Sequence, residues 1–316
     1  MSQLQRLEPG TVASCLQVLA YLEQAHVLFD HLGDRASATL IDTLERVYRA
    51  RAGIEVATHE APSAADALRV HFFGACEAFY GGVSLGGWRK KSEALFKYLV
   101  YHRAAPVHRD QLLDLFWRDS TPEAARNCLN VTLHALRRSL GEAGLGAADQ
   151  FIAFAAERYR VMPVVEIWTD VDAFNDALAN GHAALARADH GQALGHFEVA
   201  AALYRGDFLM DDRYEEWTTG PRERLRNSYL ELLVDLGQSY GDTGRHTAAL
   251  ECGRKLLEFD SCSEEGHRQV MTSYLALGQR VLALRQYRLC CETLERELGV
   301  APMPATTALY DRIRTS

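Results

Sequence analysis

The sequence of 316 residues predicts a mainly α-helical protein with one small α+β section near its middle. Two observations support this fold class. Within residues 68–165, stretches rich in β-forming residues flank three amphipathic helical stretches, which is the order of a winged helix-turn-helix with an N-terminal sheet. Further on, Gly244 and Gly278 stand 34 residues apart, and each is followed at the same offset by Ala-Leu. A period of 34 residues is typical of tetratricopeptide (TPR) helical hairpins. We therefore expect a winged helix-turn-helix domain followed by a TPR-like all-α domain, with a helical hairpin before both.

The elements of the α+β section follow from local patterns. Three short strands precede the helices, and glycine pairs follow the second and third of them. A first helix, then a shorter helix, a turn and a longer helix come next, and a loosely alternating stretch after them predicts a two-stranded wing. The strands are expected at 68–73, 77–80 and 83–85, the helices at 92–102, 107–117 and 122–140, and the wing at 150–165 with a turn near 156–158.

The helix predicted from Pro122 to Leu140 is the most informative element. Thr121 can accept hydrogen bonds from its first free N–H groups, and Pro122 fits its first turn. At about 100° per residue, one face is apolar and should pack into the domain. That face holds Ala125, Leu129, Leu133, Leu136 and Leu140. The opposite face holds Glu123, Asn127, Asn130, Val131, His134 and Arg138, and Arg126 and Arg137 lie on its flanks.

The polar face of this helix suits the reading of DNA bases. Asn can bond adenine and Arg can bond guanine, each through two hydrogen bonds, and the second helix of a helix-turn-helix fits the major groove. We predict that Asn127, Asn130, His134 and Arg138 face bases or nearby phosphates, and that Arg126 and Arg137 hold the DNA backbone. For a single amphipathic helix the ordinary interpretation is a solvated polar face, so the surrounding residues must support the prediction.

Local charge supports nucleic-acid binding although the whole chain carries a net charge of −8. Residues 88–140 contain ten Lys or Arg and five Asp or Glu, a net charge of +5, which leaves −13 for the rest. Phosphate binding needs a local positive field, not a positive protein. Lys90 and Lys91 precede the helix over 92–102, where their charge and free backbone N–H groups can both meet phosphate. A solubilising run before a helix is the alternative.

The predicted wing carries two arginines. Arg158 and Arg160 alternate along one strand, so they share a side from which they can contact the DNA backbone or the minor groove. A surface arginine pair without a ligand is the alternative.

Six short segments follow one another in a fixed order over about 245 residues. They are KSEALFKYL (91–99), RDQLLDLFW (109–117), AARNCLNVTLHALRR (124–138), TDVDAF (169–174), YRGDFL (204–209) and ERELGVAP (295–302). Their order and spacing resemble the SARP-type transcriptional activators (Streptomyces antibiotic regulatory proteins), which join an OmpR-like winged helix to a bacterial transcriptional activator domain. The resemblance implies that the helix from Pro122 is the recognition helix, that the protein binds direct repeats near a promoter, and that it helps to recruit RNA polymerase. One departure is Ala156-Glu157-Arg158 in the wing, where the family often has Gly near the turn.

These patterns divide the chain into an N-terminal helical hairpin (1–60), a linker (61–67), the winged helix (68–165) and the TPR-like activator domain (166–316). Helical hairpins must stack, because a single one cannot bury its apolar face. Such stacks generally bind proteins or dimerise. The alternative is that the stack only supports the winged helix. The N-terminal hairpin is an addition to the family pattern. Dimerisation or docking is our first interpretation of it, and a cap, a signal-receiving element or a remnant of a longer helical solenoid are the others.

Residue patterns of enzymes and metal sites are missing from the sequence. The glycine pairs lack the Lys-Ser/Thr of a phosphate-binding loop, and no nucleophile elbow is present. The acidic cluster around Asp211-Asp212 fits the first turn of a helix. The seven cysteines form no C-x-x-C pair, which predicts reduced and mostly buried thiols, and the histidines show no metal spacing. We therefore expect no catalytic residue, metal or cofactor.

The sequence thus predicts a sequence-specific DNA-binding transcriptional activator, not an enzyme. No apolar run approaches 18 residues and no signal peptide opens the chain, so we expect a cytoplasmic protein on the nucleoid with no membrane contact. The expected partners are double-stranded DNA and RNA polymerase holoenzyme, and a homodimer and a small-molecule or protein effector stay open. The alternative function is a TPR-type scaffold or signalling adaptor whose winged helix mediates protein–protein contacts. DNA binding that weakens steeply with salt distinguishes the two.

Overall fold

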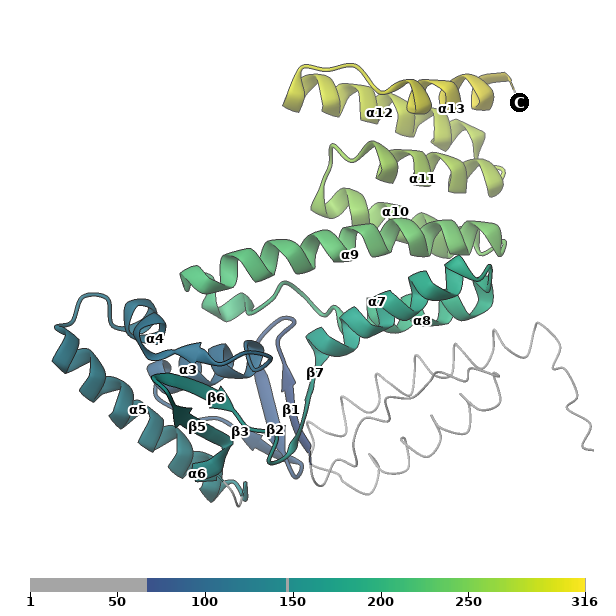
Figure 1. Ribbon diagram of the computed structural model, residues 1–316. Coiled ribbons are helices and arrows are strands. Elements are labelled where there is room, and N and C mark those ends of the chain that lie inside the picture. The colour runs from purple at the N-terminus through teal and green to yellow at the C-terminus, as the bar shows by residue number, and fades with distance from the viewer. Residues whose placement is uncertain (1–66, 146–147, 316) are drawn as a thin grey trace, which may run out of the picture. The chain divides into compact units, whose positions relative to one another are not determined.

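The computed structural model describes residues 67–145 and 148–315 (Figure 1). The chain divides into two compact units, Met1–His59 and Glu60–Ser316, and every described residue belongs to the second. The predicted N-terminal hairpin and all of the linker except Ala67 lie outside the described residues. The expected fold class is confirmed for the described unit, which is a winged helix followed by a series of packed helices.

A four-stranded sheet opens the described unit. Its strands are β1 (Ala67–His71), β2 (Glu77–Tyr80), β3 (Val83–Leu85) and β7 (Glu166–Thr169), in the order β3-β2-β1-β7. The first three are antiparallel neighbours, and Gly81 and Gly82 turn the β2–β3 hairpin with φ of 58° and 75°, values that glycine adopts without strain. The fourth strand, β7, pairs parallel with β1 although it follows the wing in the sequence. Residues 166–169, which the sequence analysis placed in the second domain, therefore complete the first sheet.

Three helices follow β3 in the chain: α3 (Lys90–Tyr101), α4 (Arg109–Phe116) and α5 (Pro122–Glu142). The α5 helix begins as predicted, because the Ala124 N–H donates to Thr121 Oγ1 at 3.4 Å and Pro122 occupies the first turn. Its buried side chains are the five that the helical spacing selects. Each buried leucine stabilises the fold by about 1.5–3 kcal/mol, so burial fixes which face of α5 points to solvent.

The wing consists of β5 (Ile152–Ala155) and β6 (Arg158–Val161), and β4 (Val107–His108) pairs with the other edge of β6. A short helix, α6 (Ala148–Phe151), precedes β5 in the chain. The turn of the wing is tight even without glycine, because Ala156 and Glu157 adopt φ of 48° and 61°. This left-handed conformation costs about 1–2 kcal/mol for each such residue. Two contacts of Arg109 offset part of that cost: its N–H donates to the Glu157 carbonyl at 2.8 Å, and its Nη2 lies 2.5 Å from Glu157 Oε2.

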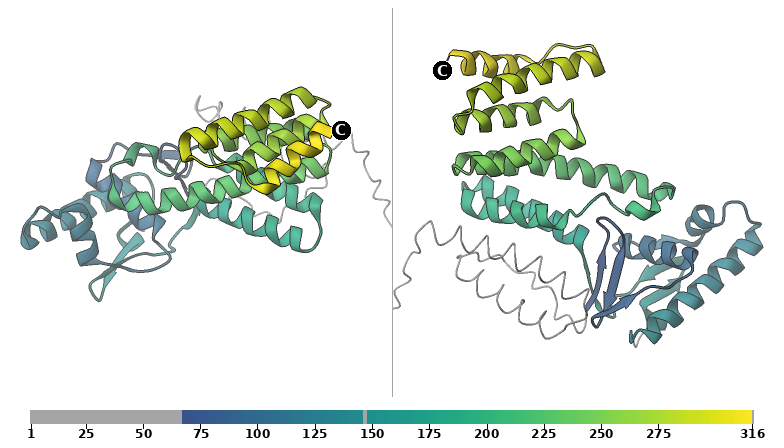
Figure 2. Two further views of the ribbon diagram at one scale, coloured as in Figure 1. Left: turned by 90° about the horizontal axis from the view of Figure 1, so that it is seen from above. Right: turned by 180° about the vertical axis from the view of Figure 1, so that it is seen from behind.

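The remaining chain is helical, and its helices stack on one another in chain order (Figures 1 and 2). They are α7 (Asp170–Ala186), α8 (His190–Leu203), the 3-10 turn η1 (Met210–Asp212), α9 (Glu216–Asp242), α10 (His246–Phe259), α11 (Glu264–Ala276), α12 (Arg280–Leu298) and α13 (Pro304–Thr315). Gly244 and Gly278, the residues of the 34-residue repeat, follow α9 and α11 with φ of 74° and 72°. The matching Ala249 and Ala283 are buried, which lets α10 and α12 pack closely against their neighbours.

One buried apolar cluster runs from Leu68 on β1 to Leu256 on α10, and so joins the winged helix to the first helices of the second part. A smaller cluster around Met271 and Ile313 stabilises the far end. Among the six described cysteines only Cys252 and Cys290 are buried, so the expectation of mostly buried thiols was wrong. No described helix is both long enough and apolar enough to cross a membrane.

The two parts meet through a packed joint. Phe72 stacks on Phe208 with ring centroids 5.6 Å apart, and Tyr98 of α3 meets Trp217 of α9 edge to face at 5.2 Å. Asp170, at the start of α7, is fully buried, and its carboxylate accepts hydrogen bonds from the N–H groups of Phe72 and Phe73 at 2.7 and 3.0 Å. These contacts fix how β1 lies against the start of α7.

Candidate nucleic-acid interface

The solvent-facing side of α5 has the side chains that the sequence analysis selected. Asn127, Asn130 and His134 are exposed, and their side chains form no hydrogen bond or ion pair within the described residues. Arg126 is likewise exposed and without an ion pair among them. Because successive residues on this face lie three or four apart, the three side chains form a row along the helix. Val131, which is 56% exposed, lies beside this row.

The two arginines near the end of α5 have different surroundings. Arg138 is exposed, and its Nε lies 3.3 Å from Oε1 of Glu142, one turn along the helix. Such exposed pairs contribute about 0–1 kcal/mol, so Arg138 can exchange this partner for another anion. Arg137 is half-buried and donates from Nη2 to the Ile152 carbonyl at 2.5 Å, while its buried Nε has no partner. Arg137 therefore also holds the base of the wing against α5.

Lys90 and Lys91 are both exposed at the start of α3. No side chain caps this helix start, where Arg89 is the N-cap residue. The Lys91 ammonium lies 5.8 Å from the centre of the Phe116 ring, at the end of α4. Since the α4–α5 turn follows Phe116 directly, Lys91 lies close to the helix-turn-helix, as a phosphate contact there requires.

On the wing, Arg158 and Arg160 are exposed and lie on one face of β6. On β5 their cross-strand partners are Ala155 and Ala153, whose side chains are small, and on β4 His108 lies opposite Arg158. The side chain of Tyr159 points to the other face and is buried.

Several cations of the positively charged stretch 88–140 form ion pairs within the protein, which the sequence did not predict. Lys97 is buried, and its ammonium bonds Asp212 of η1 at 2.7 Å and Glu93 at 2.5 Å. Burial alone lowers the pKa of Lys97, but the bonds to Asp212 and Glu93 outweigh it, so the pKa lies above its ordinary value. Arg103 pairs with Asp172 and Arg118 with Glu216, both in the helical part.

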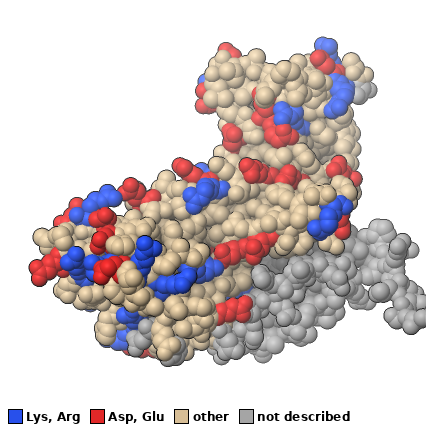
Figure 3. All heavy atoms as spheres, in the orientation of Figure 1, with Lys and Arg blue, Asp and Glu red and all other residues tan. Residues whose placement is uncertain are grey.

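These long-range pairs reduce the cations that are left for a ligand. Among residues 88–140, the exposed cations without an ion pair in the described chain are then Arg89, Lys90, Lys91 and Arg126, and Arg158 and Arg160 of the wing join them. Figure 3 shows blue Lys and Arg side chains gathered over the winged-helix end of one face, with red acidic side chains among them.

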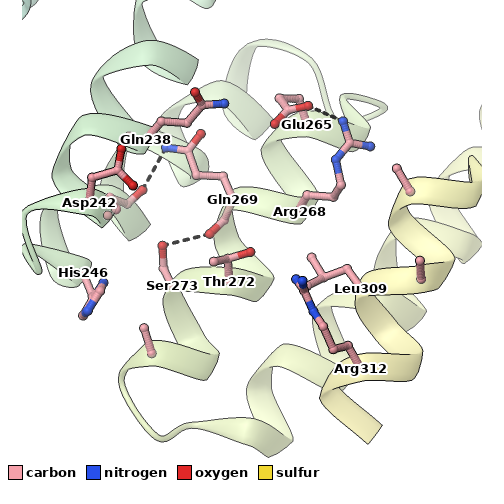
Figure 4. Close-up of a pocket in the computed structure, with 16 residues that line it drawn as sticks. Gln238, Asp242, His246, Glu265, Arg268, Gln269, Thr272, Ser273, Leu309 and Arg312 are labelled. Carbon is pink, nitrogen blue, oxygen red and sulfur yellow. Dashed lines mark hydrogen bonds and ion pairs between the residues drawn. The ribbon is translucent and has the colours of Figure 1, made fainter. Parts of the chain in front are cut away.

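A separate groove of about 560 Å³ lies between α9, α11 and α13 (Figure 4). Gly241 leaves open space along its wall, whereas the Gln269 side chain fills the space beside Gly237. Gln238, Asp242 and His246 line the groove from one side. Gln269 projects into the groove, where its Nε2 donates to the Ala249 carbonyl at 3.1 Å and its Oε1 has no partner. No sequence motif marks this groove, because its walls come from helices of different hairpins.

Comparison with known proteins identifies both parts of the chain. Residues 88–155 match the family described as transcriptional regulatory protein, C terminal, and residues 169–314 match the bacterial transcriptional activator domain. The transcriptional regulatory protein MoaR1 of Mycobacterium tuberculosis is 26% identical over 249 residues, which cover 79% of this chain and 80% of that protein. The regulatory protein DnrI of Streptomyces peucetius is 26% identical over 74% of this chain and 88% of its own length.

Two larger proteins share the same arrangement. The regulatory protein AfsR of Streptomyces griseus is 26% identical over 82% of this chain, but the match spans only 26% of AfsR. Among solved structures, Mycobacterium tuberculosis EmbR in complex with a low affinity phosphopeptide superposes with a TM-score of 0.70 and 25% identity, over 78% of this chain and 65% of that one. The chain thus joins an OmpR-like winged helix to a bacterial transcriptional activator domain, which is the arrangement of the SARP-type transcriptional regulators.

Proposed function

We propose that the protein is a sequence-specific, DNA-binding transcriptional activator that places α5 in the major groove. The observation that supports this most directly is the exposed row of Asn127, Asn130 and His134, on a helix whose other side is buried. At 1.5 Å per residue the 21 residues of α5 extend about 30 Å, and the major groove is wide enough to admit an α-helix.

Each side chain has a role in this proposal. Asn127, Asn130, His134 and Arg138 face bases or nearby phosphates, and Val131 offers an apolar contact suited to a thymine methyl group. The DNA backbone is held by Lys90, Lys91, Arg126, Arg137 and Arg158. Of these, Arg137 takes part only through the N–H groups that it does not use on Ile152.

The partners of the helical part follow from the family. We propose that α7 to α13 provide the contact with RNA polymerase holoenzyme, and that the protein acts on the nucleoid in the cytoplasm. The groove of Figure 4, at about 560 Å³, has the size of a small-molecule site and is where we would look for an effector. A homodimer is a further proposed state.

Sequencing of DNA recovered with the protein from cells would give an operator, and binding to that operator can then be measured against salt. We expect Arg138→Ala to weaken binding by about 1–3 kcal/mol if Arg138 reads a guanine, with the loss confined to operators that carry this base. The exposed Glu142 pair is too weak to account for such a loss. Equal binding by the wild type and the variant would remove the assignment.

Lys91→Ala should weaken binding to all sequences alike and should flatten the slope of log K against log salt by about one unit, because one phosphate contact is lost. Lys255→Ala on α10 is the charge-matched control, since Lys255 is also exposed but lies on the helical part. A loss that depends on sequence would contradict the role of Lys91. If the protein binds no duplex under any salt condition, the scaffold alternative replaces the activator.

A further inference from the structure

The groove between α9, α11 and α13 is lined by one face of each helix. Its floor is α11, whose lining residues recur at helical spacing from Glu265 to Ala276. The end of α9 forms one wall and α13 forms the other. Figure 4 shows Asp242 and Arg312 on these two sides of the groove. The groove therefore carries an acidic group on one wall and a basic group on the other.

Small residues keep the middle of the groove open. Ala276 on the floor and Ala305 and Ala308 on the α13 wall are all exposed. A Cβ at Gly241, on the opposite wall, would meet no atom within 4 Å. The space of about 560 Å³ lies within the range of small-molecule sites, which is about 300–1,000 Å³. The middle of the groove can thus hold the apolar body of a small molecule.

The α9 wall suits a cation. Asp242, the last residue of α9, is exposed and forms no hydrogen bond or ion pair within residues 67–145 and 148–315. The side chain of Gln238, one turn earlier, is also without a partner in these ranges. At the 34-residue offset of the repeat, Asp242 corresponds to Ala276, the last residue of α11. Two helices therefore end at this point of the groove, and the free carbonyl groups of helix ends carry partial negative charge. Together with the Asp242 carboxylate they favour an ammonium group.

The α13 wall suits an anion. Arg312 is exposed in the last turn of α13, on the same face as Ala305. Arg268 on the floor is less available, because its guanidinium bonds Glu265 and donates to Thr306 Oγ1 at 2.9 Å. A carboxylate is an anion that a guanidinium group binds through two parallel hydrogen bonds.

The distance between the two walls limits the length of a ligand. The floor helix α11 packs against both α9 and α13. Packed helices have axes about 8–10 Å apart, so the axes of α9 and α13 are at most about 20 Å apart. The side chains of Asp242 and Arg312 line the groove from these walls, which shortens the gap between the two charges. A short chain can therefore join the two ends.

We propose that this groove binds a small zwitterion, with an ammonium group at one end, a carboxylate at the other and a short apolar chain between them. The ammonium donates to Asp242 and to the side-chain oxygen of Gln238. The carboxylate accepts from Arg312, and the chain lies over Ala305 and Ala308. A simple amine would gain nothing from Arg312, and a simple carboxylate would gain nothing from Asp242. The proposal rests on the proposed role of the groove as an effector site and adds the chemical class of the effector.

Three ω-amino acids of increasing length, aminobutyrate, aminohexanoate and aminooctanoate, serve as probes. Saturation-transfer difference NMR of the full chain without DNA measures their binding. We expect the best of the three to bind with a dissociation constant of about 1 mM or below. The amine and the carboxylic acid of the same chain length have one charged end each, and they should bind at least about tenfold more weakly.

Two variants each remove one charged end of the site. Asp242→Asn and Arg312→Gln should each weaken binding of the best probe at least about tenfold. Glu258→Gln is the matched control, since Glu258 is exposed on α10 outside the groove, and it should leave binding unchanged. Far-ultraviolet circular dichroism checks that each variant keeps its helices.

No binding by any of the three amino acids overturns the proposal. So does equal binding by a probe with one charged end, or binding that Asp242→Asn or Arg312→Gln leaves unchanged. Because these measurements contain no DNA, their outcome is separate from that of the salt experiment, which tests whether the protein binds duplex.

Discussion

Asp170 allows the sharpest test of how the winged helix is joined to the helical part. Its carboxylate is fully buried and accepts hydrogen bonds from the N–H groups of Phe72 and Phe73, the two residues after β1. The Arg205 guanidinium lies 3.9 Å from the same carboxylate and compensates part of its charge, and Nδ1 of His71 lies 3.7 Å from it. Replacing Asp170 by alanine leaves both N–H groups in a space that water does not reach.

The expected loss can be worked from these contacts. A buried donor without a partner costs about 1–3 kcal/mol, so Asp170→Ala should lower the free energy of unfolding by about 2–6 kcal/mol. Asp170→Asn keeps one oxygen acceptor and should lose about half as much. Because whole domains are stable by about 5–15 kcal/mol, the alanine variant should be close to unfolding.

Urea unfolding, followed by tryptophan fluorescence and circular dichroism, measures the change. Trp88 and Trp117 report on the winged helix and Trp217 on α9, so both sides of the joint are observed. Asp172→Asn is the control, since Asp172 pairs with Arg103 at a half-exposed site, where such pairs contribute less than about 1 kcal/mol. If Asp170→Ala lost no more stability than this control, the two hydrogen bonds would not hold the joint, and our reasoning would be refuted.

Two further predictions concern the helical part. Gly181→Ala should destabilise the protein by about 1–3 kcal/mol in thermal unfolding, because a Cβ at Gly181 would lie 2.4 Å from the buried Phe197 ring. This clash outweighs the gain of about 1 kcal/mol in helix propensity. An unchanged or higher melting temperature would show that the ring can move aside. The wild type should lose stability as pH falls from about 7 to about 5, and His267→Gln should make this loss smaller. Burial lowers the pKa of His267, and the opposing effect of its hydrogen bond to the Ser261 carbonyl is weaker. As pH falls, the unfolded chain therefore binds the proton first, and stability is lost below the ordinary histidine pKa of 6.5. Parallel curves of stability against pH for the variant and the wild type would contradict this.

Local sequence determined the elements and the faces of the helices. The spacing of Leu129, Leu133 and Leu136 selected the buried side of α5 correctly, because the geometry of a helix fixes which residues share a face. The Gly244–Gly278 period likewise located the ends of α9 and α11. The wing hairpin was found from its alternation, but its left-handed turn at Ala156 and Glu157 was not. That turn is held partly by Arg109, which lies far from it in the sequence.

Tertiary structure alone decided which ion pairs the charged residues form and how β7 pairs with β1. Lys97 and Arg118 counted toward a positive field in the sequence, yet the fold pairs them with Asp212 and Glu216, about a hundred residues away. The pairing of β7 with β1 and the burial of Asp170 depend in the same way on contacts between distant segments. A periodic pattern reports only the neighbours of a residue along its own helix or strand. Which distant partner neutralises a charge, and therefore which cations stay free for phosphate, depends on how the elements pack.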